Sequence, residues 1–501
     1  MPLRLPDIEL AAIAPELVLS AVALFLLVFD AVVGDRIRRA VHLPIITLAG
    51  LAGSLWFTFD QWGSIDNEGP SLQLAGMVVN DGFALFVKFA LIAFGILAVM
   101  LGRDYLVREK LEEPEYYALL MFSLAGMMLM ASSADLIVMF IALETFSIAL
   151  YVMVGFRRRS LVSQESAMKY FLLGAFSSAF LLLGIALVYG AVGSTNLYGT
   201  QGSGTELGIA QYLATTAPTN VGLLVLATGL LIVGLGFKVA AVPFHMWTPD
   251  AYQGAPAPVT GFMAAGSKLA GFAALLRLLD VSLFQLRGDW RPIVIGIAVL
   301  TMVVGAVFAV VQEDVKRILA YSSIAHAGFV FTGIIATSDD GVAGSLFYLA
   351  TYGITVVGAF AIVAMVGGPG ERGTRLVDYR GLFYRRPALA GALSLFLLSL
   401  AGVPLTSGFV GKLVVFGPAI EAGYSWVVVV GAIASAIAAF FYLRIMVVMY
   451  MQEPEADAHP IEFGPVSAAV VGLTVAATLA LGLAWGPLFD IARQATLFFA
   501  L

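Results

Sequence analysis

The sequence predicts an all-α polytopic membrane protein with about fourteen transmembrane helices. Of its 501 residues, 60% are hydrophobic and only 12% are charged, whereas a soluble protein of this length needs far more polar surface. A helix needs about 20 mostly apolar residues to cross a hydrocarbon core of about 30 Å. Such segments recur along the chain, and we place the spans at residues 12–34, 42–60, 80–102, 116–132, 135–156, 164–193, 221–247, 256–279, 291–311, 318–337, 342–366, 388–418, 424–450 and 464–486.

Composition excludes several kinds of chemistry. The chain has no cysteine, which excludes iron–sulfur clusters, thiolate metal sites, disulfides and cysteine nucleophiles in it. The net charge of −6 is small for this length and is spread over short loops, so we expect no nucleic-acid partner. Asp7, Glu9 and Glu16 precede the first apolar core, where a cleavable signal would carry positive charge. We therefore expect the first span to be retained.

Basic residues are distributed unevenly between the loops. The loops after odd-numbered spans hold Arg36, Arg38, Arg39, Arg103, Arg108, Lys110, Arg157, Arg158, Arg159, Lys316, Arg317, Arg372, Arg375, Arg380, Arg385 and Arg386. The loops after even-numbered spans hold little beyond Arg287 and Arg291. Because short cytoplasmic loops are enriched in Lys and Arg, the odd loops are predicted to be cytoplasmic and both termini periplasmic.

Two spans carry helix-breaking residues. The seventh, "GLGFKVAAVPFHMWTPDAYQGAP", has Pro243 inside an apolar run, and the twelfth, "SLAGVPLTSGFVGKLVVFGPAI", crowds three glycines and Pro404 ahead of Lys412. Proline removes a backbone donor and glycine permits unwinding. Interrupted helices at corresponding places of two chain halves are typical of an ion site in a transporter.

Ionisable residues lie well inside these spans, although a charge at the bilayer centre costs about 2.5–3.5 kcal/mol. The residues too central to reach either surface comfortably are Glu144 in the fifth span, Lys238 in the seventh, Lys268 in the eighth and Lys412 in the twelfth. Such groups are functional candidates by default. In a low dielectric, an amine or carboxylate moves towards its neutral form, and a nearby opposite charge reverses that shift. Making or breaking an ion pair can therefore switch proton affinity, and we predict a proton relay.

Other interior ionisable residues have alternative interpretations. Lys169, in the sixth span, is a candidate switching partner of Glu144, but it could instead extend to the cytoplasmic surface. Lys88, in the third span, fits surface extension or simple packing better than a relay role. His326, in the tenth span, fits a hydrogen-bonded interior histidine that is useful but not essential. A line of ammonium groups repels sodium and exchanges protons, so H⁺ is the favoured transported species.

Four segments together resemble a known family: "FIALETFSIALYVMVGFRRRS", "ESAMKYFLLGAFSSAFLLLGIALVYG", "GLGFKVAAVPFHMWTPDAYQGAPAPVTGFMAAGSKLAGFAALLR" and "QEDVKRILAYSSIAHAGFVFTGI". With the fourteen-span layout, they resemble the antiporter-like membrane subunits of respiratory complex I, the NADH:quinone oxidoreductase. The resemblance covers nearly the whole chain and is most specific over spans 5 to 8. The chain stops at Leu501 without the long lateral helix of the largest family member, and Lys412 stands where another member has an acid. Both departures favour the branch of the family that has neither the long lateral helix nor an acid at the position of Lys412.

The resemblance implies roles for individual residues. Glu144 matches the glutamate of span 5, and Lys169 looks like its switching lysine. Lys238 is similar to the central lysine of the broken seventh helix, Lys268 to the connecting residue of span 8, and Lys412 to the lysine on the exit side. His245 and Asp250 match a motif at the end of the broken helix, although Asp250 could equally be a loop or cap residue.

The family also implies the architecture and the partners. Two inverted five-helix repeats, each with one broken helix, would occupy residues 111–285 (spans 4–8) and 286–455 (spans 9–13), between N-terminal helices in residues 1–110 and a last helix in residues 456–501. The chain would be a proton-translocating membrane-arm subunit in a bacterial inner (plasma) membrane. Its neighbours would be the antiporter-like subunit M, the small subunits K and J, and lipids. NADH, FMN, iron–sulfur clusters and quinone would be used by other subunits, with no cofactor in this chain.

Two other functions remain open on sequence alone. The chain could belong to a multisubunit sodium/proton antiporter, which would use the same relay without electron transfer. It could also be an independent transporter for a small organic solute, but the scarcity of Asn, Gln and Arg at the middle of the spans argues against that.

Overall fold

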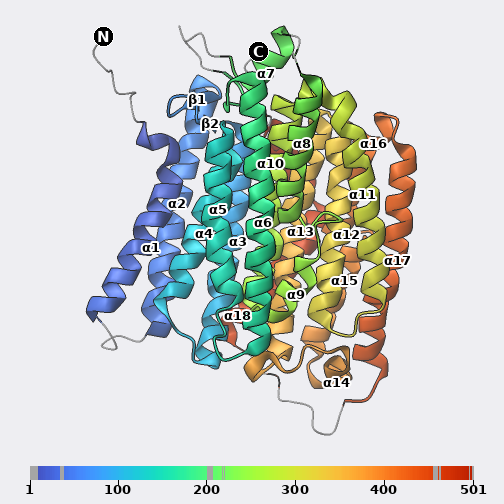
Figure 1. The fold of residues 1–501 in the computed structure, drawn as a ribbon. Coiled ribbons are helices and arrows are strands. Elements are labelled where there is room, and N and C mark those ends of the chain that lie inside the picture. Colours follow the sequence, from blue (N-terminus) through green and yellow to red (C-terminus); the bar gives the residue numbers. More distant parts are fainter. Residues whose placement is uncertain are drawn as a thin grey trace.

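A computed structural model describes residues 9–33, 39–199, 207–216, 218, 220–454, 461, 464–495 and 497–498. Asp7, Arg36, Arg38 and Leu501, which enter the sequence argument, lie outside the described residues, and so does the side chain of Arg39. The described part is a bundle of long, roughly parallel helices (Figure 1). One small antiparallel hairpin, β1 (Ser71–Gln73) and β2 (Val78–Asn80), lies at one end of the bundle.

The helices agree with the predicted spans. Their bounds are α1 Ala14–Val33, α2 Arg39–Glu68, α3 Gly82–Glu109, α4 Pro114–Ser132, α5 Leu136–Val154, α6 Leu161–Val192, α7 Ile209–Thr215, α8 Val221–Lys238, α9 Trp247–Gly254, α10 Ala257–Leu276, α11 Arg287–Val310, α12 Val315–Ala336, α13 Asp339–Val366, α14 Leu382–Arg385, α15 Pro387–Ala401, α16 Ser407–Glu421, α17 Ser425–Met451, α18 Pro465–Leu483 and α19 Gly486–Gln494. Within the described ranges, 13 helical segments are long and apolar enough to cross a membrane. The pair α15–α16 supplies the remaining predicted span, so the fold class is confirmed.

Polar side chains define where several of these helices begin. Asp81 and Asp135 accept hydrogen bonds from the first-turn amides of α3 and α5, and Asp314 does the same for α12. These caps bond first-turn amides that have no hydrogen-bond partner inside the helix. An amide without a partner is costly near a membrane. Helices α3 and α13 also continue past the predicted apolar spans, into polar residues at their ends.

The two ends of the bundle can be told apart by their residues. The hairpin end contains β1–β2, and isolated strand-like pairs join Val78 to Ser133 and Asp135 to Asn196 there. The opposite end, here called the basic end, contains Arg157, the start of α12 with Lys316, and the loop with Glu371. Two of the described basic residues used above to assign the cytoplasmic side, Arg157 and Lys316, therefore lie together at one end.

Both predicted interruptions are present. Residues 239–246 separate α8 from α9, and residues 402–406 separate α15 from α16. Each broken helix is the fourth crossing in a group of five: α4, α5, α6, α8–α9 and α10, then α11, α12, α13, α15–α16 and α17. The first group starts at the basic end, whereas α11 starts at the hairpin end, so the groups run in opposite directions (Figure 1). The exact domain boundaries stay a prediction.

Burial separates central helices from peripheral ones. Every residue of α10 is buried, and α12 and α13 are almost as enclosed. Peripheral helices such as α6 and α17 expose large apolar side chains, among them Phe176 and Phe440. An apolar exterior around an enclosed centre is the arrangement expected of a bundle surrounded by lipid. It places α10 and α12, which carry Lys268 and His326, in the interior of the molecule.

Candidate proton-transfer site

Lys238 lies in a chamber of aromatic side chains. It is the last residue of α8 and is 2% exposed. Its ammonium is 3.2 Å from the hydroxyl of Tyr151. It also lies 5.0–5.6 Å from the ring centres of Phe146, Tyr151, Tyr170 and Phe237. Aromatic faces attract a cation, and the ammonium hydrogen-bonds only the Tyr151 phenol among the described residues.

The break after Lys238 is held open by specific hydrogen bonds. Ala240 has a left-handed backbone, with φ of 61°. The Val242 amide donates to Thr301 Oγ1 at 2.9 Å, and Trp247 Nε1 donates to the Phe237 carbonyl at 2.9 Å. Non-helical backbone at this depth must find such partners because lipid offers none. The break therefore places Lys238 at a helix C-terminus, where the free carbonyl groups favour a cation.

Glu144 faces this chamber from α5. It is half-buried and accepts a hydrogen bond from Ser178 on α6. It lies near enough to Lys238 for the two charges to act on one another. Tyr151 stands seven residues after Glu144 on the same helix, a spacing of about two turns that puts both side chains on one face. Glu144, Tyr151 and Lys238 thus form the first part of the site.

The expected pairing of Glu144 with Lys169 is not formed. The Lys169 side chain is 46% exposed, and its ammonium lies 2.7 Å from Glu165 and 3.0 Å from Asp250. Ser178, the partner of Glu144, is nine residues further along α6, which is about 13 Å at a helical rise of about 1.5 Å per residue. Lys169 is on the surface near the basic end, as its alternative interpretation held. Of the two carboxylates it meets there, Glu165 belongs to α6 and Asp250 to α9.

Asp250 does not act as a helix cap. It lies in the first turn of α9, whose start has no capping side chain. Its Oδ2 pairs with Lys169, and its Oδ1 lies 2.7 Å from Arg317 Nη1. Asp250 therefore bridges α6 of the first group to α12 of the second. His245 lies half-buried in the break, and its Nδ1 has no hydrogen-bond partner among the described residues.

Lys268 occupies the enclosed centre of the bundle. Its ammonium donates to the Ser323 carbonyl on α12 and lies 6.0 Å from the ring of Tyr352. The Ser323 hydroxyl is 3.3 Å from the hydroxyl of Tyr252. Lys268 thus makes its polar contacts across the boundary between the two five-helix groups, since it belongs to α10 and Ser323 to α12.

A second group of hydrogen-bonded hydroxyls surrounds His326. His326 Nδ1 is 2.5 Å from the Tyr348 hydroxyl, and its Nε2 is 3.3 Å from the Tyr442 hydroxyl. Tyr442 also hydrogen-bonds Ser322. His326 is close enough to Lys268 and Lys412 for the charges of both to act on it. As expected, it is a hydrogen-bonded interior histidine, and it lies between two of the candidate lysines.

Lys412 lies at the second break. Its ammonium is 2.8 Å from the Ala401 carbonyl, 3.2 Å from the Leu400 carbonyl and 3.1 Å from Ser435 Oγ. The two carbonyls belong to the last turn of α15, which has no further helical amides to bond them. Lys412 and Lys238 therefore share a setting: each amine lies at the C-terminus of the first half of a broken helix.

Lys88 was expected to extend to the surface or to pack simply, and the surface expectation was wrong. Its side chain is 2% exposed, and its ammonium lies 2.9 Å from Glu16 Oε1, an ion pair without the geometry of a directed hydrogen bond. It also donates to Gln61 Oε1 at 3.3 Å. A buried amine needs such partners, and α1 and α2 supply them at this position. The pair ties the N-terminal helices together, away from the candidate relay.

The sequence argument missed the residues that hydrogen-bond the ionisable groups. Tyr151, Ser178 and Tyr442 do so through their hydroxyls and Ser323 through its carbonyl, but all four are common types in membrane helices. A signal existed for Tyr151, because it lies two turns from Glu144. Nothing comparable marked Ser178 or Tyr442, whose partners come from distant segments.

The Asp250 bridge allows a test. Asp250→Asn removes two ion pairs that are partly open to solvent, and pairs of this kind contribute about 0–1 kcal/mol. We expect the variant to assemble normally and to lose at most about fivefold in turnover, the rate equivalent of about 1 kcal/mol. The measurement is turnover in membranes, with Glu165→Gln, which removes the other and more exposed partner of Lys169, as the control. A loss above tenfold for Asp250→Asn, with no such loss for Glu165→Gln, would contradict this expectation and show that the Asp250 bridge is more than a surface contact.

Comparison with known proteins identifies the family. Residues 133–438, which include every candidate from Glu144 to Lys412, match the family described as "NADH:quinone oxidoreductase/Mrp antiporter, TM". NADH-quinone oxidoreductase subunit N of Parafrankia sp. is 43% identical over 98% of this chain and 95% of its own length. The chain belongs to the subunit N family of NADH-quinone oxidoreductases. This is the branch that Lys412, which stands where another family member has an acid, favours.

A solved structure of respiratory complex I is similar to this chain. A chain of respiratory complex I from Thermus thermophilus is 34% identical, covers 95% of this chain and 100% of its own length, and superposes with a TM-score of 0.78. A chain of the Mrp complex from Dietzia sp. superposes with a TM-score of 0.82 over 97% of each chain, but at 22% identity it shows a shared fold only. The fold is therefore common to both complexes, whereas the sequence identity favours the subunit N family.

Proposed function

We propose that this chain is a proton-translocating membrane-arm subunit of NADH:quinone oxidoreductase. The observation that carries the proposal is the series of interior ionisable groups Glu144, Lys238, Lys268, His326 and Lys412, which lie at the two broken helices and on the helices packed around them. All of them except Lys268 hydrogen-bond a hydroxyl group. Interior groups of this kind are costly to bury and mark proton pathways in membrane proteins. Membership in the subunit N family supports the same conclusion.

The proposed mechanism is electrostatic. A charge change at a neighbouring subunit alters the balance between Glu144 and Lys238, and this changes the proton affinity of the amine. The proton then passes through water and hydroxyl groups to Lys268, along the Ser323, His326 and Tyr442 contacts, and on to Lys412. Lys169 stays at the surface, where it pairs with Glu165 and Asp250 instead of Glu144.

The redox chemistry is assigned to other subunits of the complex. NADH, FMN, iron–sulfur clusters and quinone would be bound there, and the adjacent membrane neighbours would be subunit M and the small subunits K and J. In the part of the chain that the structure describes, no three His, Cys, Asp or Glu residues are grouped to hold a metal ion. A sodium/proton antiporter complex is the less supported alternative, because the likeness to the Mrp chain is one of fold.

Purifying the native assembly tests the proposal. If the chain is isolated from detergent-solubilised membranes through an affinity tag, flavin and iron–sulfur absorbance should co-purify with it, together with NADH-dependent quinone reduction. A pure preparation that exchanges sodium for protons in liposomes and contains no flavin would favour the antiporter.

The proposed orientation has its own test. The basic end would face the cytoplasm, and because the chain has no cysteine, single cysteines can be placed without background. A cysteine at Arg159, exposed at the basic end, should react with a membrane-impermeant maleimide only in inverted vesicles. A cysteine at Asp289, exposed at the hairpin end, should react only in right-side-out vesicles. The opposite pattern would invert the assignment.

A further inference from the structure

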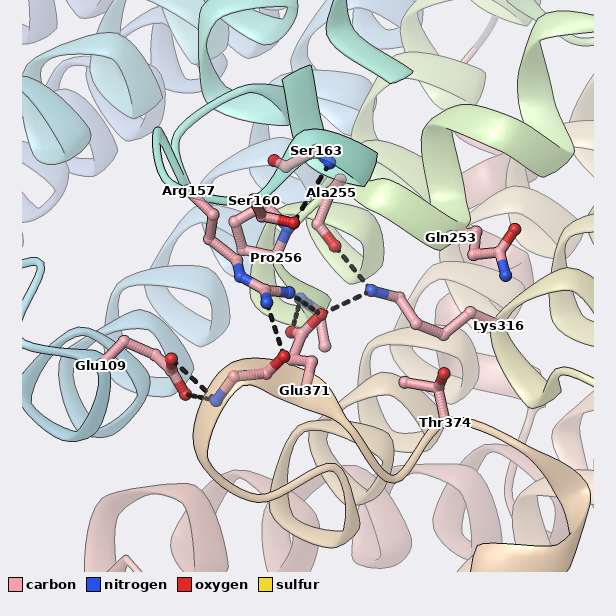
Figure 2. A network of polar contacts seen from close by, with 12 residues as sticks. Glu109, Arg157, Ser160, Ser163, Gln253, Ala255, Pro256, Lys316, Glu371 and Thr374 are labelled. Carbon is pink, nitrogen blue, oxygen red and sulfur yellow. Dashed lines mark hydrogen bonds and ion pairs between the residues drawn. The ribbon is translucent and has the colours of Figure 1, made fainter. Parts of the chain in front are cut away.

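A buried group of three charges lies at the basic end, apart from the candidate relay (Figure 2). Glu371 Oε2 is 2.8 Å from Lys316 Nζ and 3.2 Å from Arg157 Nη1. The side chains of Lys316 and Glu371 are 0% and 2% exposed, and that of Arg157 is 16% exposed. The sequence placed Arg157 and Lys316 only among the basic loop residues, and Glu371 had no assigned role.

The three charges come from three different parts of the fold. Arg157 lies between α5 and α6 of the first group, Lys316 in the first turn of α12, and Glu371 in the loop after α13. The second oxygen of Glu371 accepts a hydrogen bond from the Ala257 amide at 2.6 Å, at the first residue of α10. Lys316 also donates to the Ala255 carbonyl at 2.6 Å. Figure 2 shows Glu371 between the two cations and below the turn that starts α10.

The loop that carries Glu371 is itself held in one position. Arg157 Nη2 donates to the Gly370 carbonyl at 2.5 Å, and the Gly370 amide donates to both oxygens of Glu109 at 3.0 Å. Glu371 has a left-handed backbone, with φ of 48°, which is unfavourable for a residue with a side chain and persists where surrounding contacts enforce it. The contacts of the loop therefore direct the carboxylate towards α10 and α12.

Glu371 stays ionised in this setting. Burial alone would raise the pKa of its carboxyl, but the facing Lys316 and Arg157 cations outweigh burial and hold the pKa below its ordinary value. A carboxylate with a depressed pKa contributes its full stabilisation of the fold at pH values above its ordinary pKa. That contribution is lost only as the pH falls through the lowered pKa. At neutral pH it therefore acts as a fixed charge and does not exchange protons.

The helices joined by Glu371 also carry a central contact of the candidate relay. Lys268 lies on α10, about three turns beyond Ala257, and Ser323 lies on α12, about two turns beyond Lys316. Lys268 donates to the Ser323 carbonyl. A shift of α10 along α12 at the basic end would therefore move the Lys268 ammonium relative to that carbonyl.

We propose that Glu371 is a positioning residue for proton transfer: with Arg157 and Lys316, it fastens the starts of α10 and α12 and so holds Lys268 at Ser323. The functional part of this inference rests on the proposed function, whereas the structural part does not. The group has a net charge of +1, and Glu371→Gln raises it to +2 while keeping an acceptor for the Ala257 amide. An uncompensated buried charge is strongly unfavourable, so the cations should separate and shift the helix starts.

Turnover of the assembled complex tests the functional part. A misplacement of about 1 Å can cost about 100-fold in rate, and we expect Glu371→Gln to lower NADH-dependent quinone reduction at least tenfold. The double variant Glu371→Gln with Arg157→Met restores the net charge to +1 and keeps the Lys316 hydrogen bond to the Ala255 carbonyl, which joins the start of α12 to the residues just before α10. It should recover at least half of the wild-type rate. Glu115→Gln, which removes an exposed carboxylate in the first turn of α4 at the same end of the bundle, should stay within twofold of wild type. A double variant no faster than Glu371→Gln would overturn the proposal, since that result is expected of a residue that itself carries protons.

Hydrogen exchange tests the structural part in the intact complex. Glu371→Ala should speed exchange of the amides in the first turn of α10, which includes the Ala257 amide bonded to Glu371, while exchange in α17 stays as in wild type. If Glu371→Ala prevents assembly, Glu371→Asp provides the same test, because its shorter side chain weakens the same contact. Unchanged exchange at α10 would refute the positioning role even if the chain pumps protons. Altered exchange in a complex that pumps no protons would refute only the proposed function.

Discussion

Complexes that contain Lys238→Met should assemble with unchanged or slightly higher thermal stability and lose at least 90% of their coupled quinone-reductase turnover. The stability follows from the aromatic chamber: the ammonium has one phenol and four ring faces as partners. Replacing such a buried charge by an apolar side chain of similar volume is often neutral or stabilising. The loss of turnover follows because methionine cannot accept a proton at the only amine of the first broken helix. A tenfold loss corresponds to about 1.4 kcal/mol.

The measurement is NADH-dependent quinone reduction in sealed membranes, normalised to assembled complex, with a thermal melt of the same preparation. Lys110→Met is the matched control, because Lys110 is an exposed lysine at the end of α3. The control should retain wild-type turnover. Turnover near wild type for Lys238→Met would remove Lys238 from the relay, and a collapse of assembly would show that its charge is structural.

Lys268→Met should cause a comparable loss, and Lys268→Arg should not repair it. Lys268 is the amine between the two five-helix groups, and it makes its hydrogen bond to Ser323 across their boundary. Arginine keeps the charge and can donate to the same carbonyl, but it does not give up its proton in proteins. A proton carrier therefore fails as arginine, whereas a residue that only supplies charge tolerates the exchange.

Quinone reduction at neutral pH, again per assembled complex, distinguishes these roles. Every residue of α10 is buried, so the larger guanidinium of Lys268→Arg can slow turnover by disturbing the packing. Lys268→Met has a smaller side chain, so a loss of turnover in that variant reports the loss of the amine and not a packing effect. Both variants should assemble and both should be slow. Recovery of at least half of the wild-type rate by Lys268→Arg would show that a fixed charge is sufficient at this position.

The fold could be predicted from local features of the sequence. Each span is an apolar run long enough to cross a bilayer, and Pro243 and Pro404 mark the two breaks directly, since proline cannot continue a helix bond. The helix ends were less predictable because α3 continues through charged residues to Glu109. There, hydrogen bonding within the helix extends beyond the apolar stretch that hydropathy detects.

The site could be predicted only in part. Lys238, Lys268 and Lys412 were placed correctly in the interior because each lies far along an apolar span. The pairing of Lys169 with Asp250 could not be predicted, because it depends on where α9 resumes after the break. Burial of Glu371 could not be predicted either. From sequence alone a charged loop residue is expected to be exposed to solvent, and only the structure shows that the starts of α10 and α12 enclose it.

The number of protons moved per pair of electrons tests the central claim most directly. Proton uptake and quinone reduction would be recorded together in sealed vesicles that contain wild-type complex, Lys238→Met or the Lys110→Met control. If protons cross the membrane through the interior lysines of this chain, the control matches wild type, and whatever turnover remains in Lys238→Met moves fewer protons per electron pair or none. A Lys238→Met complex that reduces quinone at the wild-type rate with the wild-type proton ratio would contradict the account.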